Sequence, residues 1–172
     1  ASDLKAPPAS WFAASGNRTA MALPPGDTLT AVFLKQAAAR PRQPIFADQS
    51  SGARTYRDLV TAVLVLKPKL ERLPGAYVGI MMPASVGATV FLLAALFAGK
   101  TPVMVNWTAG TRALRHSLDT LGVATVVTAR ALVAKLGSSG VDLSAIEDTF
   151  LFVEDVLAAV KPAEKLRAAL TS

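Results

Sequence analysis

Short runs of apolar residues alternate along the chain with longer segments whose apolar residues recur at helical spacing. The uninterrupted runs, which predict buried strands, cover residues 76–82, 102–105, 123–128 and 150–153. The periodic segments, which predict helices, cover residues 28–39, 59–73, 85–98, 111–121, 129–136 and 162–170. Apolar strands that alternate with helices are typical of a parallel sheet covered on both sides. The pattern therefore predicts an α/β layered fold with a mostly parallel sheet and helices on both faces.

The first 26 residues differ in composition from the rest of the chain. Residues 1–26 are rich in Ala, Pro, Ser and Gly, and Trp11 and Phe12 are their only large aromatic anchors. We interpret them as an extended lead-in segment and residues 27–172 as one α/β unit. A short strand at 45–48 and a turn at 50–53 open that unit after its first helix.

Local signals set the expected helix boundaries. Asp27 is a suitable N-cap for the helix 28–39. Residues 55–58 have the form of a capping box with Asp in place of the usual Glu, and residues 144–147 form a second one. Pro68 lies inside a helical pattern, so we expect it to kink or divide that helix.

Residues 73–99 are uncharged and long enough to cross a bilayer, which takes about 20 residues. Pro83 and Gly99 break this stretch into a strand and a helix, and another apolar strand follows. We therefore favour the reading without a transmembrane span, and a membrane protein that uses 73–99 as a span is the alternative. No secretory signal is evident at the N-terminus.

Composition narrows the chemistry further. A hydrophobic fraction of 52% with 17% charged residues excludes a disordered chain. The absence of cysteine excludes a disulfide scaffold, a thiol nucleophile and a cysteine zinc site, and His116 alone excludes a multi-histidine metal site. The net charge of +6 comes from scattered basic residues without interleaved aromatics, so we expect no nucleic-acid binding.

Candidate chemical motifs mostly have plain structural explanations. The chain contains neither Gly-x-Gly-x-x-Gly nor Gly-Lys-Ser/Thr, and the small residues at 137–140 indicate a surface turn rather than a phosphate loop. His116 and Asp119 could form an acid/base pair. The simpler interpretation, which we favour, is that they are neighbours on a solvated helix face. The acidic pairs 147–148 and 154–155 are magnesium ligands, general bases or solvated loop residues, and we favour solvation.

One loop is a candidate binding element. Residues 106–110 follow a predicted buried strand at its carboxyl end, where open α/β sheets tend to place ligands. The candidate substrate-pocket residues are Asn106, Trp107 and Thr108. Trp107 either forms a wall of the pocket or anchors the loop on the core, and the anchoring role is the simpler one.

Five segments in order resemble one known family. They are Thr55-Tyr-Arg-Asp-Leu59, Val78-Gly-Ile-Met-Met-Pro-Ala-Ser85, Gly99-Lys100, Pro102-Val-Met-Val-Asn106 and Val126-Val-Thr128. Their order and spacing resemble the AMP-forming adenylating enzymes, which include acyl-CoA and acyl-carrier-protein synthetases. The resemblance covers about residues 27–160 and implies the N-terminal subdomain of an adenylate-forming ligase. Within the family, the segments 106–110, 128–130 and 151–156 look like those of acyl-carrier-protein synthetases.

Several family motifs are absent from this chain. It has no Ser/Thr/Gly-rich phosphate loop, no later adenine or ribose motif, and no mobile C-terminal lysine domain. The spacing of His116 and Asp119 also differs from the His-x-x-x-x-Asp motif of glycerolipid acyltransferases. No catalytic, cofactor-binding or metal-binding residue of the family can therefore be assigned to a position here.

The resemblance implies the N-terminal part of a fatty-acid ligase that is inactive by itself. The whole enzyme would use ATP and Mg and act on a fatty acid with CoA or acyl-carrier protein as the acceptor. We expect it in the cytoplasm, with peripheral contact to the inner face of the membrane. The alternative function is a free-standing α/β module that binds a small apolar acid or a protein partner.

Overall fold

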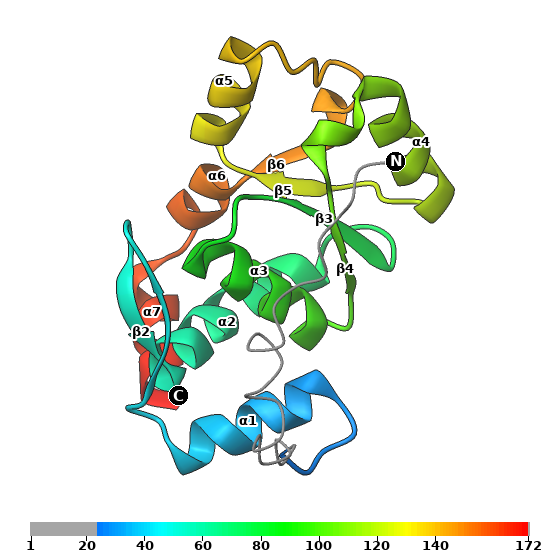
Figure 1. Ribbon diagram of the computed structural model, residues 1–172. Coiled ribbons are helices and arrows are strands. Elements are labelled where there is room, and N and C mark those ends of the chain that lie inside the picture. Colours follow the sequence, from blue (N-terminus) through cyan, green and yellow to red (C-terminus); the bar gives the residue numbers. More distant parts are fainter. Residues whose placement is uncertain (1–23, 172) are drawn as a thin grey trace, which may run out of the picture.

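A four-stranded parallel sheet organises the protein, and residues 24–171 are described in this computed structural model (Figure 1). Most of the predicted lead-in segment, with Trp11 and Phe12, lies outside the described residues. The strands of this sheet are β3 (Tyr77–Met81), β4 (Thr101–Met104), β5 (Val126–Thr128) and β6 (Phe150–Phe152). Their order across the sheet is β4-β3-β5-β6, and each neighbouring pair is parallel. The predicted parallel sheet is confirmed.

Helices cover both faces of the sheet (Figure 1). On one face, Val78, Ile80 and Val127 pack with α1 (Leu29–Ala39), α2 (Tyr56–Glu71) and α3 (Val86–Phe97). On the other face, Met81 and Val126 pack with α4 (Thr111–Leu121) and α5 (Arg130–Ser138). Because successive strand residues point to opposite faces, both clusters draw on the same strands. This arrangement confirms the α/β fold class, and it explains why the strands are apolar throughout.

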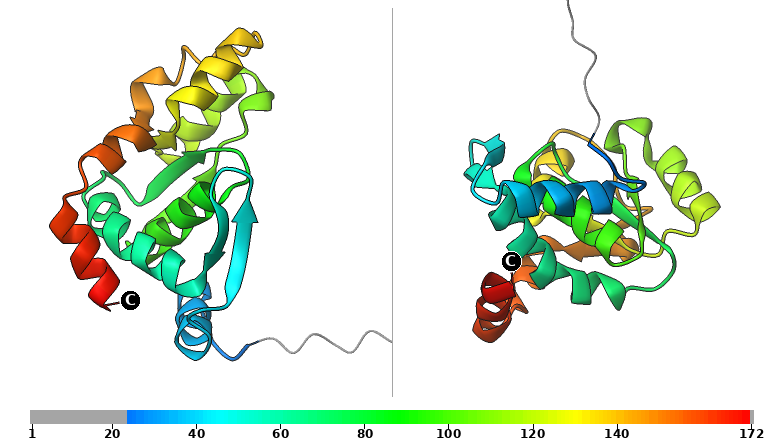
Figure 2. Two further views of the ribbon diagram at one scale, coloured as in Figure 1. Left: turned by 90° about the vertical axis from the view of Figure 1, so that its left-hand side faces the viewer. Right: turned by 90° about the horizontal axis from the view of Figure 1, so that it is seen from below.

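The remaining elements are a hairpin before α2, two short helices in loops of the sheet, and two helices after β6 (Figure 2). An antiparallel hairpin of β1 (Pro44–Asp48) and β2 (Gly52–Thr55) precedes α2. Two short 3-10 helices, a short helix and a terminal helix complete the chain: η3 (Trp107–Ala109), η4 (Glu147–Thr149), α6 (Val153–Ala158) and α7 (Pro162–Thr171). The terminal helix α7 packs alongside α2.

Hydrogen bonds at the helix N-termini show how local sequence sets α2 and α3. The capping box predicted at Thr55 and Asp58 is confirmed, because each side chain accepts the other residue's backbone N–H. The N-terminus of α3 has two caps. Ser85 accepts from the Ala88 N–H, and Asp48, which ends β1, accepts from the Val86 N–H at 2.8 Å. Two backbone hydrogen bonds, the stronger from Val86 and the other from Ser51, therefore lower the pKa of Asp48 to about 2.

Lys100 fastens the loop that leads from α2 into the sheet. It follows Gly99 at the end of α3, and its Nζ donates to the Leu73 carbonyl at 2.7 Å and to the Gly75 carbonyl at 2.6 Å. The Gly99-Lys100 segment of the family resemblance therefore has a structural role here. One charged donor thus satisfies two carbonyls of this loop.

Two predicted helix caps are wrong, and one predicted helix break does not occur. The N-cap of α1 is Thr28 and not Asp27, because the Thr28 side chain accepts from the Ala31 N–H and the helix begins one residue later. No capping box forms at residues 144–147, where the 3-10 helix η4 begins after Ile146 without a side-chain cap. Pro68 does not divide α2, since it lies in the last turn and only the Leu64 carbonyl loses an intrahelical partner.

Residues 73–99 form a loop, β3, a turn and α3 in sequence. Among residues 24–171, no helix has the length and apolar character needed to cross a bilayer.

Candidate functional site

The candidate loop at residues 106–108 lies at the carboxyl edge of the sheet, directly after β4. Asn106 Oδ1 accepts from the Thr108 N–H at 3.1 Å and from the Thr108 hydroxyl at 2.8 Å, which closes the short helix η3. Trp107 is half-buried against the core cluster beneath α4 and α5, whereas Asn106 and Thr108 are exposed. This contact supports the anchoring role of Trp107. The substrate-pocket role of the three residues stays a prediction.

A second group of side chains meets where β5 and β6 end. The Arg130 guanidinium binds the Asp155 carboxylate at 2.7 Å and lies 4.4 Å from the centre of the Phe152 ring. The Glu154 carboxylate accepts from the Arg130 backbone N–H at 3.0 Å, so it caps α5 in place of Ala129. The hydrogen bond from Arg130 lowers the pKa of Asp155. Both carboxylates of this acidic pair therefore have structural partners.

The other acidic pair and His116 lie on the surface near α4. Arg115 binds Asp119 at 2.9 Å and Asp148 at 3.3 Å, and hydrogen bonds with these two carboxylates raise the pKa of the guanidinium. Asp119 thus pairs with Arg115 rather than with His116, which is exposed. The structure does not form the His116–Asp119 acid/base pair.

ATP and Mg, which the resemblance implies, would need acidic side chains free to bind a cation. Within residues 24–171, no three His, Asp or Glu side chains come together in a metal-binding arrangement. The acidic side chains at the carboxyl edge are occupied by Arg130 and by the N-terminus of α5. The turn at residues 137–140 ends α5, and Gly140 has φ +80°, as expected for a surface turn. The acidic residues at the carboxyl edge therefore have structural partners, and they do not form a magnesium-binding cluster among the described residues.

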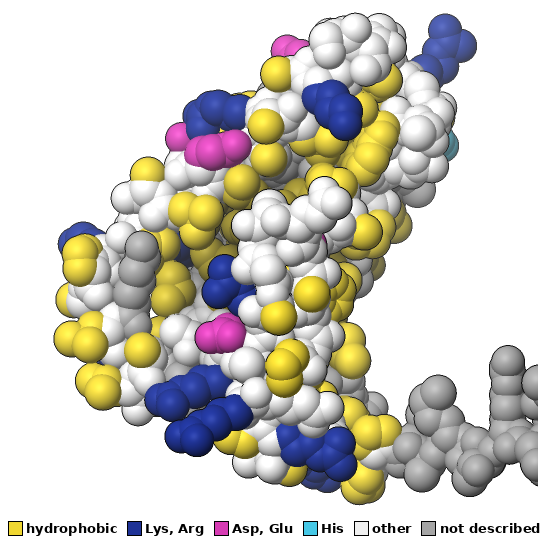
Figure 3. Space-filling model, turned by 60° about the vertical axis from the view of Figure 1, so that its left-hand side comes forward, with side chains coloured by type: hydrophobic (Ala, Val, Ile, Leu, Met, Phe, Trp, Pro, Cys, Tyr) yellow, Lys and Arg dark blue, Asp and Glu magenta, His cyan; other side chains and the backbone are white. Residues whose placement is uncertain are grey.

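A cavity of 670 Å³ lies elsewhere, and sequence reasoning missed it. It opens between α2, α3, the hairpin and the two C-terminal helices, and the same region is hollowed in the space-filling view (Figure 3). Its apolar walls come from α2, α3, the end of α6 and the loop that follows it: Leu59, Ala62, Val65, Leu66, Val86, Val90, Phe91, Leu157 and Val160. Its polar lining comes from β2, the turn before it and the first turns of α2: Ser51, Arg54, Arg57, Asp58 and Thr61.

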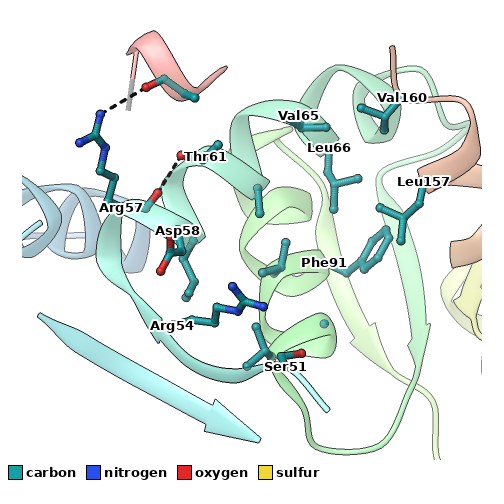
Figure 4. Close-up of a pocket in the computed structure, with 16 residues that line it drawn as sticks. Ser51, Arg54, Arg57, Asp58, Thr61, Val65, Leu66, Phe91, Leu157 and Val160 are labelled. Carbon is teal, nitrogen blue, oxygen red and sulfur yellow. Dashed lines mark hydrogen bonds between the residues drawn. The ribbon is translucent and has the colours of Figure 1, made fainter. Parts of the chain in front are cut away.

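Two arginines near the cavity have different environments (Figure 4). Arg57 lies at the rim of the cavity and donates to the Ala169 carbonyl at 3.4 Å, so it links α2 to α7. The Arg54 side chain points into the cavity, and its guanidinium has no hydrogen bond or ion pair within residues 24–171. Hydrogen bonds from the Thr55 backbone and side chain lower the pKa of Asp58, and the positive charge of Arg54 adds to this effect.

One sequence signal pointed to this cavity. Residues 86–97 are apolar all round, and a helix of that kind needs cover on every side. The sheet and α2 cover part of α3, but Val90 and Phe91 also face the cavity. The apolar character of α3 was visible in the sequence, whereas the position of α6 and α7 was not.

Comparisons with known proteins identify the class. The AMP-binding enzyme family matches residues 33–169, so the chain belongs to that family. Three solved structures share the fold. A benzoate CoA ligase from Burkholderia xenovorans LB400 has 19% identity and a TM-score of 0.61, over 80% of this chain and 29% of that one. VinN in complex with L-aspartate has 15% identity and a TM-score of 0.65, over 87% and 40%.

The third structure is a Mycobacterium tuberculosis fatty acyl CoA synthetase, with 19% identity, a TM-score of 0.55, and coverage of 80% of this chain and 28% of that one. This chain therefore spans well under half of the length of each of these relatives. Its α/β architecture matches the N-terminal subdomain of adenylate-forming ligases.

Proposed function

We propose that this chain is the N-terminal subdomain of an adenylate-forming acid–thiol ligase. The whole enzyme activates a carboxylate with ATP and Mg to an acyl-adenylate and then passes the acyl group to a thiol. The family match over residues 33–169, on a four-stranded parallel sheet with helices on both faces, is the observation that carries the proposal.

The role of this subdomain is structural. Glu154 and Asp155 at the carboxyl edge of the sheet are held by Arg130, and no cluster of three metal-ligating side chains forms among the described residues. It positions the carboxyl edge of a rigid sheet for the rest of the enzyme. The chain alone is therefore expected to be inactive.

The finer proposal concerns the substrate. The segments 106–110, 128–130 and 151–156 look like the synthetase half of the bifunctional acyl-carrier-protein synthetase/2-acylglycerophosphoethanolamine acyltransferase. One structural relative is a fatty acyl CoA synthetase, but others are a benzoate CoA ligase and a protein bound to L-aspartate. We propose a fatty acid as the carboxylate and acyl-carrier protein or CoA as the thiol. The protein would work in the cytoplasm, in peripheral contact with the membrane.

Carboxylate-dependent exchange between ATP and pyrophosphate tests the proposal. The complete protein encoded by the gene is incubated with labelled pyrophosphate, ATP, Mg and one acid at a time: a long-chain fatty acid, benzoate or L-aspartate. Exchange is expected with the fatty acid and only in the complete protein. The 172-residue chain, assayed in parallel, serves as the matched control.

The outcomes separate the two levels of the proposal. If no carboxylate supports exchange by the complete protein, the ligase function is wrong. If benzoate or aspartate is preferred, the ligase function stands and the fatty-acid assignment fails. Exchange by the 172-residue chain alone would contradict its structural role. Adding CoA or acyl-carrier protein to the active complete protein then identifies the acceptor.

A further inference from the structure

The cavity between α2, α3 and the C-terminal helices has the size and lining of a small-molecule site. Its volume of 670 Å³ lies within the range of ligand pockets, about 300–1,000 Å³. Leu66, Val90 and Phe91 on its walls are nearly fully buried by their neighbours, so the walls are fixed by the core. A preformed apolar surface of this kind binds hydrocarbon groups without ordering the protein first.

Polarity is distributed unevenly along the cavity (Figure 4). Ser51 and Arg54 lie at one end, on β2 and the turn before it. Leu157 and Val160 lie at the opposite end, beyond Phe91. A molecule with one polar group and one apolar tail matches this distribution, because the tail can follow the apolar wall away from the polar end.

The charges at the polar end favour an anion. The Arg54 guanidinium points into the cavity, and its fork of N–H donors suits a carboxylate or a phosphate. Asp58 lies nearby, but its carboxylate already accepts from the Thr55 N–H and hydroxyl, both at 2.8 Å. Arg57 adds a second positive charge beside it. Arg54, Arg57 and Asp58 together carry a net charge of one positive unit. The N–H donors of the Arg54 guanidinium have no partner among residues 24–171.

From these features we infer that the cavity is a binding site for a single-chain amphiphile with an anionic head. The head binds Arg54, and the hydrocarbon tail lies between α2 and α3 and ends against Leu157 and Val160. The head is a carboxylate or a phosphate monoester, since both fit the same guanidinium. This inference goes beyond the ligase function, because it requires neither ATP nor any residue outside this chain.

Calorimetric titration of the 172-residue chain tests the inference, in the absence of ATP and Mg. The probes are decanoate, decyl phosphate and 1-decanol, each kept below the concentration at which it aggregates. The two anions are expected to bind with one site per chain and more tightly than the neutral alcohol. The ratio of the two anion affinities identifies the head group. In heteronuclear NMR spectra, the Gly87 amide at the cavity wall is expected to shift, and the Gly110 amide just before α4 is not.

Two exposed side chains probe the two ends. Arg54→Gln removes the charge at the head and is expected to weaken anion binding by about tenfold while leaving 1-decanol unchanged. Leu157→Glu places a charge at the tail end and is expected to weaken all three probes by about tenfold or more. Arg112→Gln and Leu121→Glu are matched controls on α4, and all four positions are exposed, so the fold is retained.

Several results would overturn the inference. One is the absence of saturable binding by both anions. Another is equal affinity for decanoate and 1-decanol, or an equal effect of Arg54→Gln and Arg112→Gln. Sedimentation that shows a dimer insensitive to both anions but broken by Leu157→Glu would assign the cavity to a second copy of the chain. None of these results depends on pyrophosphate exchange, so this inference and the ligase function can fail separately.

Discussion

Gly79, in the middle of β3, packs tightly against its neighbours in the parallel sheet. A Cβ at this position would lie 2.8 Å from Val126 Cγ2, 3.1 Å from Val105 Cγ2 and 3.3 Å from Val126 Cα. Gly79 and Val126 are partners in the β3–β5 register, and the Gly79 N–H donates to the Thr125 carbonyl at 2.9 Å. The backbone contact cannot be relieved by rotating a side chain. Gly79→Ala should therefore push β3 and β5 apart.

The expected cost combines two opposing effects. Overpacking a tight core by one methyl group costs about 1–3 kcal/mol. Replacing glycine by alanine in a strand recovers about 0.5–1 kcal/mol, because the unfolded chain loses less conformational freedom. Gly79→Ala should therefore lower the free energy of unfolding by about 1–2 kcal/mol. With a urea m-value of about 2 kcal/mol/M, the midpoint falls by about 0.5–1 M.

Urea denaturation of the 172-residue chain, followed by circular dichroism, measures this effect. The double variant Gly79→Ala/Val126→Ala locates the clash, because removing the two methyl groups of Val126 creates the missing space. The loss of stability in the double variant should be smaller than the sum of the two single losses by about 1 kcal/mol. Gly137→Ala is the control, since nothing lies within 4 Å of the added Cβ in α5. It should stabilise the protein by about 0.4–1 kcal/mol.

Two outcomes would refute this reasoning. One is a Gly79→Ala variant with an unchanged or higher midpoint. The other is strict additivity with Val126→Ala, which would show that the two side chains do not compete for the same space. A positive result would explain the glycine of the Val-Gly-Ile segment as a packing requirement between strands.

Three further substitutions test single contacts. Lys100→Met removes two hydrogen bonds to carbonyls, so the free energy of unfolding should fall by about 1–3 kcal/mol in urea denaturation. Asp48→Asn tests the pKa of Asp48, which is lowered to about 2 in the folded protein. Because the unfolded chain binds the proton more readily, the wild type should lose stability as the pH falls from 4 to 2. The variant lacks this carboxylate, so its Tm should decline less steeply over the same range. Thr55→Ala removes one half of the capping box and should cost about 1 kcal/mol in urea denaturation.

Each of these tests has a matched reference. Lys135→Met on the exposed side of α5 should leave the midpoint unchanged, and an equal loss there would contradict the role of Lys100. Gln49→Ala, in the turn beside Asp48, changes no titratable group and should preserve the wild-type slope between pH 4 and 2, whereas the same flattening in both variants would exclude a specific effect of Asp48. Asp58→Asn should reproduce the loss caused by Thr55→Ala, because the two side chains cap each other.

The features that the sequence predicted correctly depend on local or periodic information. The capping box at Thr55 and Asp58 lies within four residues, and the apolar strand 77–81 needed only its own composition. Ser144 had an equally good local pattern, but Leu143 and Ile146 are buried in the core. With these two side chains buried, the chain forms the 3-10 helix η4 here, and the predicted capping box is absent.

Features that join distant segments were not predictable in this way. Asp48 caps α3 from 38 residues away, and Glu154 caps α5 from 24 residues away. In the sequence, Asp48 was only the end of a short strand and Glu154 only part of an acidic pair. The cavity likewise depends on where α6 and α7 return to α2, which no local pattern specifies.

Pro102 determines which edge of the sheet can pair with an additional strand. The amides of Thr101 and Val105 donate toward β3, so the alternation along β4 turns position 102 outward. Proline has no N–H to donate, and an added strand would lose a ladder hydrogen bond at this point. The outer side of β6, whose residues Phe150–Phe152 all carry amides, has no such defect. Further strands of a longer protein would therefore join at β6, and β4 would remain the boundary of the sheet.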